Sequence, residues 1–234
     1  MINTEFLKKE AEKMGIQLSA SALSRFDLLA QRLVSYNRKV NLTAITEPDD
    51  IVIKHFLDSI SPLPHISLKE RAKIIDVGCG AGFPGLPLLI AREDLDVTFL
   101  DSIEKKLKFI EDVMQNTGLF GTTVHGRAED FGIRPAFREQ YDAAFTRAVA
   151  PLNVIAEYCL PFVKPGGLYV SMKGASDESE LGRNAITKLG GEVENIVSFK
   201  LMNGDSRNLI MIRKVSHTSP EYPRKTKKIA VSPL

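Results

Sequence analysis

The sequence predicts an α/β protein in which a seven-stranded, mostly parallel sheet with an antiparallel last strand is covered by helices and preceded by a helical extension. Two observations lead to this prediction. From residue 73 onward, short apolar segments alternate with longer amphipathic ones, which is typical of strand–helix–strand units. Before residue 71, the apolar residues recur at the three- and four-residue steps of helices.

The helical extension, residues 1–70, is predicted to contain three helices that pack on the domain behind it. Residues 3–14 form a short first helix, and residues 19–40 carry apolar side chains on one face over a longer stretch. Thr46-Glu-Pro-Asp49 then places Thr and an acid three apart, as in a capping box, ahead of the apolar run IVIKHFLDSI.

The domain at residues 71–215 is predicted to hold the sheet. Only Leu201 to Ser206 joins its last two strands, and a parallel connection needs a dozen or more residues, so this pair should be antiparallel. Seven strands with the last one reversed resemble the Rossmann-like sheet of class I methyltransferases. The predicted strands are KIIDVGC (73–79), VTFLD (97–101), TTVHG (122–126), YDAAFTR (141–147), GLYVSMK (167–173), EVENIVSFK (192–200) and RNLIMIRK (207–214), with helices near 84–92, 103–117, 150–162 and 177–189.

Composition narrows the class of protein. The 234 residues are 44% hydrophobic and 26% charged, with a net charge of +2, as in ordinary globular chains. No apolar run is long enough to span a membrane and MINTEFLKKE lacks a signal layout, so we expect a cytoplasmic protein without a membrane partner. Cys79 and Cys159 lie eighty residues apart and predict neither a metal site nor a disulfide.

The last residues, 216–234, are predicted to form a basic tail. From Arg213 onward, six basic residues stand against one acid, Glu221. Lys and Arg that neutralise phosphates release counterions, so this tail is a candidate for contact with nucleic acid. A solvated tail that only aids solubility is an equal alternative.

The stretch DVGCGAGFPG, residues 76–85, fits the glycine loops of two cofactors. Read from Gly80 it is G-x-G-x-x-G, the dinucleotide fingerprint, and read from Gly78 through Gly80 to Gly82 it is G-x-G-x-G. In both, glycines let the backbone approach a ligand after the first strand. Asp76 favours S-adenosyl-L-methionine, because a carboxylate suits its ammonium and sulfonium groups but would repel a pyrophosphate.

Two further strand ends are predicted to line the cofactor site. Asp101 closes VTFLD, where a carboxylate can accept hydrogen bonds from ribose hydroxyls, although it could instead cap the next helix. Ala128 and Glu129 follow the third strand, at the edge where ligands bind in such sheets, and are placed to flank an adenine. A polar loop without a ligand is the alternative at that position.

The fourth strand ends in Thr146-Arg-Ala-Val149 and lacks the Asn or Asp with Pro-Pro-aromatic of many amino-group methyltransferases. Methylation of an exocyclic amine is therefore disfavoured, and the absence of a cysteine here argues against covalent attack on cytosine C5. Arg147 cannot shed its charge, so it should meet Glu129, a methionine carboxylate or a phosphate. Among the histidines, His55 is the best functional candidate, with Asp58 on the same helix face.

Motifs along nearly the whole chain carry a family resemblance. They are Asn41-Leu-Thr43, His55-Phe-Leu-Asp-Ser59, DVGCGAGFPGLP, Asp101-Ser102 with Lys105 and Lys106, Gly126-Arg-Ala-Glu129, Thr146-Arg-Ala148, Met172-Lys-Gly174, Arg207-Asn-Leu and Tyr222-Pro-Arg-Lys225. HFLDS, RAED, TRAV and YPRK are the most specific of them in combination. On these motifs the chain resembles the RsmG family, also called glucose-inhibited division protein B, whose members methylate N7 of one guanine in the 530 loop of bacterial 16S rRNA.

The resemblance implies a cofactor and a partner. The cofactor would be S-adenosyl-L-methionine, and the partner 16S rRNA or the small ribosomal subunit, gripped by the extension and the tail. We expect a monomer without a metal. After Lys225 the chain continues with Thr226 to Leu234, where the family usually has glycine and a proline-rich end, so the resemblance does not extend to the tail's geometry. By the same resemblance, the residues that contact the cofactor would be Gly78, Phe83, Ala128, Glu129 and Arg147.

The predicted chemistry needs no catalytic residue. Guanine N7 has a lone pair in the ring plane and no proton to lose, so its attack on a methyl carbon requires alignment rather than a general base. Alternatives that stay open are methylation of another RNA such as tRNA, methylation of a small molecule, and a ribosome-assembly RNA-binding protein with a vestigial pocket. An NAD oxidoreductase is the weakest of them. The candidates for contact with an unstacked RNA segment are Arg147, Lys173, Arg224 and Lys225.

Overall fold

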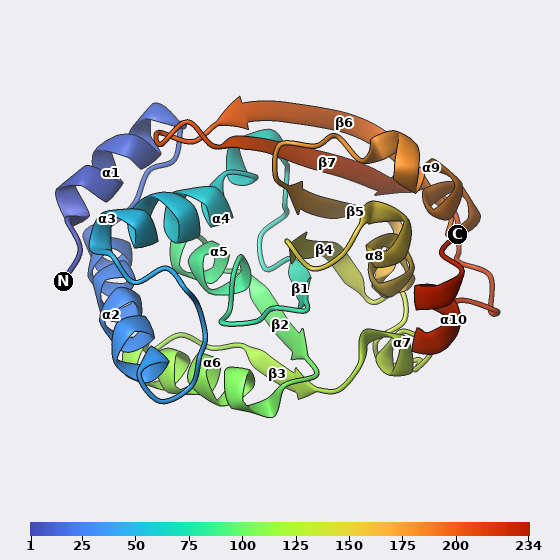
Figure 1. Ribbon diagram of the computed structural model, residues 1–234, viewed down its shortest axis with the longest axis horizontal. Coiled ribbons are helices and arrows are strands. Elements are labelled where there is room, and N and C mark those ends of the chain that lie inside the picture. The colour runs from blue at the N-terminus through green and yellow to red at the C-terminus, as the bar shows by residue number, and fades with distance from the viewer.

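Seven strands form one sheet at the centre of the computed structural model, which describes all residues 1–234 (Figure 1). The strand order across the sheet is β3-β2-β1-β4-β5-β7-β6. β7 runs antiparallel to both of its neighbours, and the other four pairs are parallel, which confirms the predicted sheet. The strands are β1 (Lys73–Val77), β2 (Asp96–Asp101), β3 (Thr122–His125), β4 (Tyr141–Arg147), β5 (Val163–Lys173), β6 (Gly191–Lys200) and β7 (Ser206–Lys214).

The strand order reverses between β1 and β4, and this switch point fixes the place of the site. On β1, Ile75 lies opposite Thr98 of β2 on one side and opposite Ala144 of β4 on the other. The chain leaves β1 and β4 toward helices on opposite faces of the sheet. A crevice therefore opens outside the carboxyl ends of these two strands.

Helices cover both faces of the sheet. One face buries a hydrophobic cluster of 40 side chains under α1, α2, α5 and α6, and the other a cluster of 20 under α8 and α9. No helix combines the length and the apolar composition needed to cross a bilayer. The helices are α1 (Thr4–Lys13), α2 (Ala20–Asn37), α3 (Pro48–Asp50), the π-helix η1 (Ile51–Leu57), α4 (Asp58–Ile60), the 3-10 helix η2 (Leu63–His65), α5 (Gly85–Ala91), α6 (Glu104–Thr117), α7 (Ala128–Phe131), α8 (Leu152–Cys159), the 3-10 helix η3 (Leu160–Phe162), α9 (Ser179–Lys188) and α10 (Thr226–Val231).

The N-terminal helices share the larger hydrophobic cluster with the sheet. Phe26 of α2 and Phe56 of η1 pack with ring centroids 4.9 Å apart, and Phe56 lies 6.4 Å from Phe83 in the loop after β1. The start of α2 follows from its sequence, because the hydroxyl of Ser19 accepts a hydrogen bond from the backbone N–H of Ala22 at 3.0 Å.

The predicted capping box at Thr46 is wrong. Helix α3 begins with Pro48 in its first turn, and its N-cap residue is Glu47, whose side chain makes no capping hydrogen bond. Proline has the helical φ built in and no N–H to satisfy, so a hydroxyl cap is not required there. The apolar run that follows is π-helical over Ile51–Leu57, a winding that side-chain periodicity does not distinguish from an α-helix.

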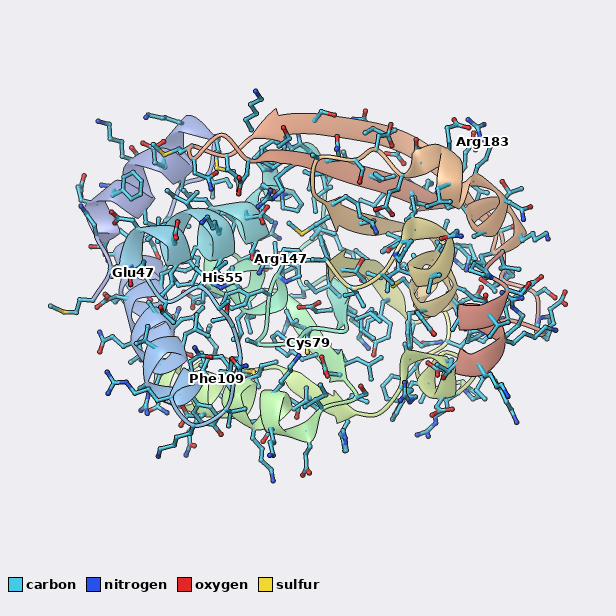
Figure 2. All side chains as sticks on the ribbon, viewed as in Figure 1. Glu47, His55, Cys79, Phe109, Arg147 and Arg183 are labelled. Carbon is cyan, nitrogen blue, oxygen red and sulfur yellow. The ribbon has the colours of Figure 1, made fainter.

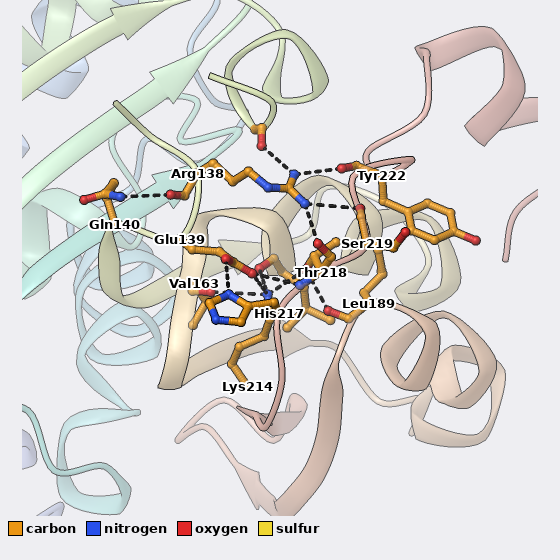
Figure 3. Close-up of polar contacts among 12 residues, drawn as sticks. Arg138, Glu139, Gln140, Val163, Leu189, Lys214, His217, Thr218, Ser219 and Tyr222 are labelled. Carbon is orange, nitrogen blue, oxygen red and sulfur yellow. Dashed lines mark hydrogen bonds and ion pairs between the residues drawn. The ribbon is translucent and has the colours of Figure 1, made fainter. Parts of the chain in front are cut away.

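The C-terminal tail is fastened to the body of the protein (Figure 3). The guanidinium of Arg138 donates hydrogen bonds to the carbonyl oxygens of Thr218 at 2.6 Å, Ser219 at 3.1 Å and Tyr222 at 2.8 Å. Beyond them lies α10, which the sequence analysis did not predict. This helix of six residues buries one side chain, Ile229, and so has no periodic signal.

Lys214 anchors the same region from inside the protein. Its side chain is 0% exposed, and burial lowers the pKa of its ammonium to about 8. The ammonium donates to Glu139 Oε1 at 3.1 Å, to the carbonyl oxygen of Leu160 at 2.9 Å and to the hydroxyl of Thr218 at 2.6 Å. A buried ammonium in this position is satisfied by the Glu139 carboxylate and by neutral oxygen acceptors around it.

Replacing Lys214 by Met should therefore destabilise the protein. We expect Lys214→Met to lower the free energy of unfolding by about 3 kcal/mol, because it leaves the Glu139 carboxylate without its buried cation. Urea unfolding followed by circular dichroism measures this. Lys188→Met, on the exposed end of α9, is the matched control and should change stability by less than about 0.5 kcal/mol. Equal losses for the two variants would contradict the anchoring role.

Candidate active site

A cavity of about 510 Å³ lies at the carboxyl edge of the sheet, at the switch point between β1 and β4. Its wall is built from the loops that follow β1, β2, β3 and β4, with two residues of α8. Leu42, Thr43 and His55 of the N-terminal extension complete the wall. The sheet and the extension thus form one site together.

The glycine loop brings backbone atoms of β1 to the cavity. Gly78 has a φ of +69°, and its N–H donates to the carbonyl oxygen of Leu100 at 2.8 Å, which holds the loop against β2. A Cβ added to Gly78 would lie 3.2 Å from the side chain of Val149. Glycine is required here because a side chain would combine a left-handed backbone with a tight contact at the cavity wall.

Gly82 belongs to the turn that leads into α5 and does not line the cavity. Its φ is +83°, and an added Cβ would lie 2.5 Å from the side chain of Leu86. Gly82 therefore shapes the loop, and its contact with a cofactor stays a prediction.

Asp76 lies beneath the glycine loop and is 1% exposed. Its Oδ2 accepts a hydrogen bond from the N–H of Gly85 at 2.8 Å, whereas Oδ1 is buried without a partner. Burial raises the pKa of this carboxyl to about 7. Asp76 does not line the cavity. Its direct contact with a cofactor therefore stays a prediction.

Asp101 ends β2 and lines the cavity. Its Oδ2 accepts from the N–H of Gly80 at 2.9 Å, and its Oδ1 accepts from the N–H of Ile103 at 2.8 Å. The carboxylate is therefore held by the glycine loop on one side and by the entrance to α6 on the other. Each carboxylate oxygen keeps a second lone pair. Asp101 can therefore hold the two backbone N–H groups and still accept hydrogen bonds from a ribose, as predicted.

Ala128 and Glu129 open the short helix α7 and line the cavity from the β3 side. The Glu129 side chain is buried, its Oε1 has no hydrogen-bond partner, and burial raises the pKa of the carboxyl. Tyr158 of α8 lines the same part of the wall. An unpartnered carboxylate oxygen beside a cavity is suited to a ligand that brings a donor.

Arg147, at the end of β4, is held by the N-terminal extension. Its Nη1 donates to the carbonyl oxygen of Lys54 at 2.9 Å and lies 3.4 Å from Asp58 Oδ2, and its Nη2 lies 3.2 Å from His55 Nδ1. Asp58 also receives Arg207 of β7, whose Nε is 3.1 Å from the same oxygen. The sequence analysis named Glu129 as a possible partner of Arg147, but the acid that Arg147 meets is Asp58.

His55 connects this cation to the cavity wall, and Figure 2 shows it beside Arg147 at the centre of the molecule. Because Arg147 donates to Nδ1, the proton of the neutral ring sits on Nε2, which donates to the hydroxyl of Thr43 at 3.0 Å. The ring stacks on Phe83 with centroids 4.4 Å apart and planes at 8°. Burial and the charge of Arg147 lower the pKa of His55 to about 3, so this histidine is neutral near pH 7 and cannot act as a base.

Most of the predicted cofactor residues meet at the cavity, but of the predicted RNA residues only Arg147 lines it. Lys173 lies inside the protein and pairs with Glu178 at 2.9 Å, Arg224 pairs with Glu157 at 2.7 Å, and Lys225 is exposed in the tail. The sequence analysis missed the lining residues Leu42, Thr43, Ile103, Lys106, Arg127, Val149 and Tyr158 as site residues, although several lie in the motifs of the family resemblance. The predicted residues that line the cavity are Gly78, Gly80, Phe83, Asp101, Ala128, Glu129 and Arg147.

These features fit a nucleoside that carries a positive charge. Gly78 and Gly80 carry no side chain at the wall on the β1 side, and the wall carries the carboxylates of Asp101 and Glu129. At the cavity wall, Oε1 of Glu129 lacks the hydrogen-bond donors that a ligand could bring. A ligand with an ammonium and hydroxyl groups would supply them, as S-adenosyl-L-methionine does.

The chain is similar to known proteins over nearly its whole length. It is 48% identical to the Ribosomal RNA small subunit methyltransferase G of Bacillus subtilis, over 94% of each chain. It is 45% identical to the protein of that name from Acetivibrio thermocellus, over 98% of this chain and 96% of the relative.

Solved structures share the fold at low sequence identity. TrmN from Thermus thermophilus matches with a TM-score of 0.55 at 14% identity, over 70% of this chain and 53% of that one. A putative methyltransferase from Haloferax volcanii, in complex with the Trm112 activator, matches with a TM-score of 0.58 at 12% identity, over 79% and 98% of the chains. The sequence profile described as rRNA small subunit methyltransferase G matches residues 22–210. The chain therefore belongs to the rRNA small subunit methyltransferase G family.

Proposed function

We propose that this protein transfers the methyl group of S-adenosyl-L-methionine to N7 of a guanine in the 530 loop of 16S rRNA. Membership of a family of small-subunit rRNA methyltransferases is the observation that carries this proposal. The protein is thus a methyltransferase that acts on 16S rRNA and uses S-adenosyl-L-methionine as the methyl donor. The assignment of atom N7 and of the 530 loop is more specific than family membership. It rests on the family resemblance of HFLDS, RAED, TRAV and YPRK.

The residues at the cavity support the binding of this donor. Asp101 and Glu129 present carboxylates to hydroxyl and amino groups, and Phe83 with Arg147 closes the side that faces the N-terminal extension. The unpartnered Oδ1 of Asp76 favours a positive charge close to the glycine loop. When bound, the donor supplies an electrophilic methyl group on a positively charged sulfur.

The remaining chemistry is alignment of the guanine. N7 has no proton to lose, so the reaction needs no general base, and the low pKa of His55 agrees with a positioning role for that ring. The product purine carries a positive charge, which carboxylate or carbonyl oxygens close to it would stabilise. We therefore assign no catalytic proton donor or acceptor.

We propose a monomer as the active unit. The reaction as written requires no metal ion, since neither the nucleophile nor the methyl carbon needs Lewis-acid activation. We place this activity in the cytoplasm, with 16S rRNA or the small subunit that contains it as the partner.

The decisive experiment supplies the protein with isotope-labelled S-adenosyl-L-methionine and 16S rRNA or small subunits from cells that lack this gene. Transfer RNA serves as the competing substrate, and mass spectrometry locates the label. We expect label on N7 of one guanine in the 530 loop and none on tRNA. Label on another atom or another RNA would refute the proposed substrate, and cofactor binding without any labelled RNA would point to a small-molecule substrate.

Gly78→Asp should sharply reduce methyl transfer at limiting S-adenosyl-L-methionine while leaving the protein folded. The new side chain meets Val149 at the cavity wall, and overpacking of about 1–3 kcal/mol corresponds to a roughly 10- to 100-fold rise in the Kd for S-adenosyl-L-methionine. Isothermal titration measures the Kd. Gly118→Asp is the matched control: its φ of +68° gives the same backbone strain, but nothing lies within 4 Å of an added Cβ. Cofactor binding by Gly78→Asp equal to that of the control would contradict the placement.

Affinity for S-adenosyl-L-methionine should rise with pH through the pKa of Asp76, which burial raises to about 7. Below that pH the carboxyl is protonated and neutral, so it no longer attracts the cationic ligand, and Kd should rise by up to about tenfold per pH unit of acidification. Titrations between about pH 6 and about pH 8 test this. Asp76→Asn should bind weakly with a flatter profile, and an unchanged pH profile in this variant would exclude Asp76 as the cause.

A further inference from the structure

Three of the four residues first considered for RNA contact already have internal partners. Arg224 pairs with Glu157, whose side chain is 0% exposed, and the Lys173 side chain is 7% exposed beside Glu178. The guanidinium of Arg147 is taken up by the N-terminal extension. An incoming phosphate would have to break these pairs, at a high cost for buried charges. The cations that meet RNA must therefore be sought among unpaired residues.

Three unpaired cations lie on one side of the cavity mouth. Lys106, in the first turns of α6, and Arg127, between β3 and α7, both line the cavity. Lys105 is exposed next to Lys106. The segments after β2 and β3 that lead to these residues lie side by side, because the ring of His125 is 3.2 Å from the carbonyl oxygen of Ser102. The mouth is therefore basic along the ends of β2 and β3.

The end of α2 adds one more exposed cation, Lys39. α2 and α6 lie side by side in Figure 1 and run antiparallel, because their contacts move toward the start of α6 as they move toward the end of α2. Continuing that series brings residue 39 beside the first turn of α6, whereas Arg38 lines a different pocket with Met1, Thr46 and Pro48. The contacts are Arg25 with the carbonyl oxygen of Thr117 at 3.0 Å, Arg32 with Asp112 at 3.8 Å, and Tyr36 with Phe109 at 5.3 Å between ring centroids.

The chain after Lys39 then returns to the cavity wall. The Asn37 side chain fixes this return, because its Oδ1 accepts from the N–H groups of Leu42 at 2.7 Å and Thr43 at 3.0 Å. Leu42 and Thr43 line the cavity, so Lys39 is tied to its border by a few residues.

We propose that four cations form a basic rim that binds the phosphates flanking the target nucleotide of an unstacked RNA strand. This inference rests on the proposed function and names the surface that presents the substrate to it. Ile103 and Val149, which are 47% and 44% exposed at the cavity, offer apolar surface to a base turned out of its stack. Lysine and arginine around such a pocket hold the backbone without reading the bases. The basic rim consists of Lys39, Lys105, Lys106 and Arg127.

Acidic residues cancel only part of this charge, although the carboxylates of Asp101 and Glu129 line the cavity beside Lys106 and Arg127. Glu104, at the start of α6, pairs with Lys108 at 3.3 Å, and Asp130 is the exposed acid nearest in sequence to Arg127. The rim therefore has an excess of positive charge next to the cavity, whereas the whole molecule is close to neutral with +2. Such a local field concentrates a polyanion at the site.

Three triple variants with the same change in net charge test the proposal. The rim variant, Lys39→Gln with Lys105→Gln and Arg127→Gln, alters only residues of the basic rim. The tail variant carries Lys225→Gln, Lys227→Gln and Lys228→Gln. The control carries Lys9→Gln, Lys188→Gln and Lys200→Gln, on elements α1, α9 and β6 that contribute nothing to the cavity wall.

The measurements are KM for 16S rRNA, kcat, and the Kd for S-adenosyl-L-methionine, across a series of salt concentrations. We expect the rim variant to raise the RNA KM at least about tenfold with kcat and the cofactor Kd unchanged, since it removes uniform binding. Its plot of log KM against log salt should be shallower by about 2, at about 0.7 per lost phosphate contact on a single strand. The control and tail variants should stay within about twofold of the wild type.

Other results would overturn the basic rim. A tail variant that raises KM as much as the rim variant, or alone, would assign the phosphates to the tail. An equal rise in KM for all three variants would show that the effect comes from net charge and not from the basic rim. If wild-type protein binds S-adenosyl-L-methionine but labels no 16S rRNA, the proposed function itself fails, and that result is distinct from a rim variant that behaves like the wild type.

Discussion

The buried positive charge of Arg147 is the constraint on which the site depends. A guanidinium keeps its proton at any accessible pH, so a buried one needs a counter-charge and hydrogen-bond acceptors. These come from the N-terminal extension, through Asp58 and the carbonyl oxygen of Lys54. Arg207 of β7 binds the same carboxylate. One acid on the extension therefore holds the ends of two strands of the sheet and fixes the wall of the cavity between them.

The predicted boundary near residue 70 separates parts that the structure joins by packing. Phe26, Phe56 and Phe83 form a continuous aromatic contact from α2 to the loop after β1. His55 stacks on the other side of that contact, against Phe83. The extension thus completes a hydrophobic cluster that would otherwise leave α5 and α6 exposed to water.

The sheet could be predicted because its signals are local. Each strand is a short apolar segment bounded by polar residues, and the loop of Leu201 to Asp205 is too short to allow a parallel return. The glycines of the loop were readable for the same reason, since left-handed turns need them wherever they occur. Signals of this kind do not depend on the rest of the chain.

The partners of charged side chains could not be read in that way. Arg147 and Asp58 are 89 residues apart, and Arg224 and Glu157 are 67 apart, so only the folded chain selects them among many possible pairs. The sequence placed Arg147 correctly at a strand end and His55 near Asp58, but it could not tell that these residues would meet. The same limit explains why Arg224 and Lys173 were considered for RNA although both are enclosed in the protein.

The two backbone hydrogen bonds of Asp101 have a consequence for the thermodynamics of ligand binding. Its carboxylate is already held by Gly80 and Ile103 in the protein without ligand, and the Thr43 hydroxyl is held by His55 and by the N–H of Ile45. Little rotational freedom is left to lose at these positions when a ligand arrives. The entropic penalty of association therefore falls mainly on the ligand, and a flexible molecule such as S-adenosyl-L-methionine gives up its own internal rotations to fit a rigid receptor.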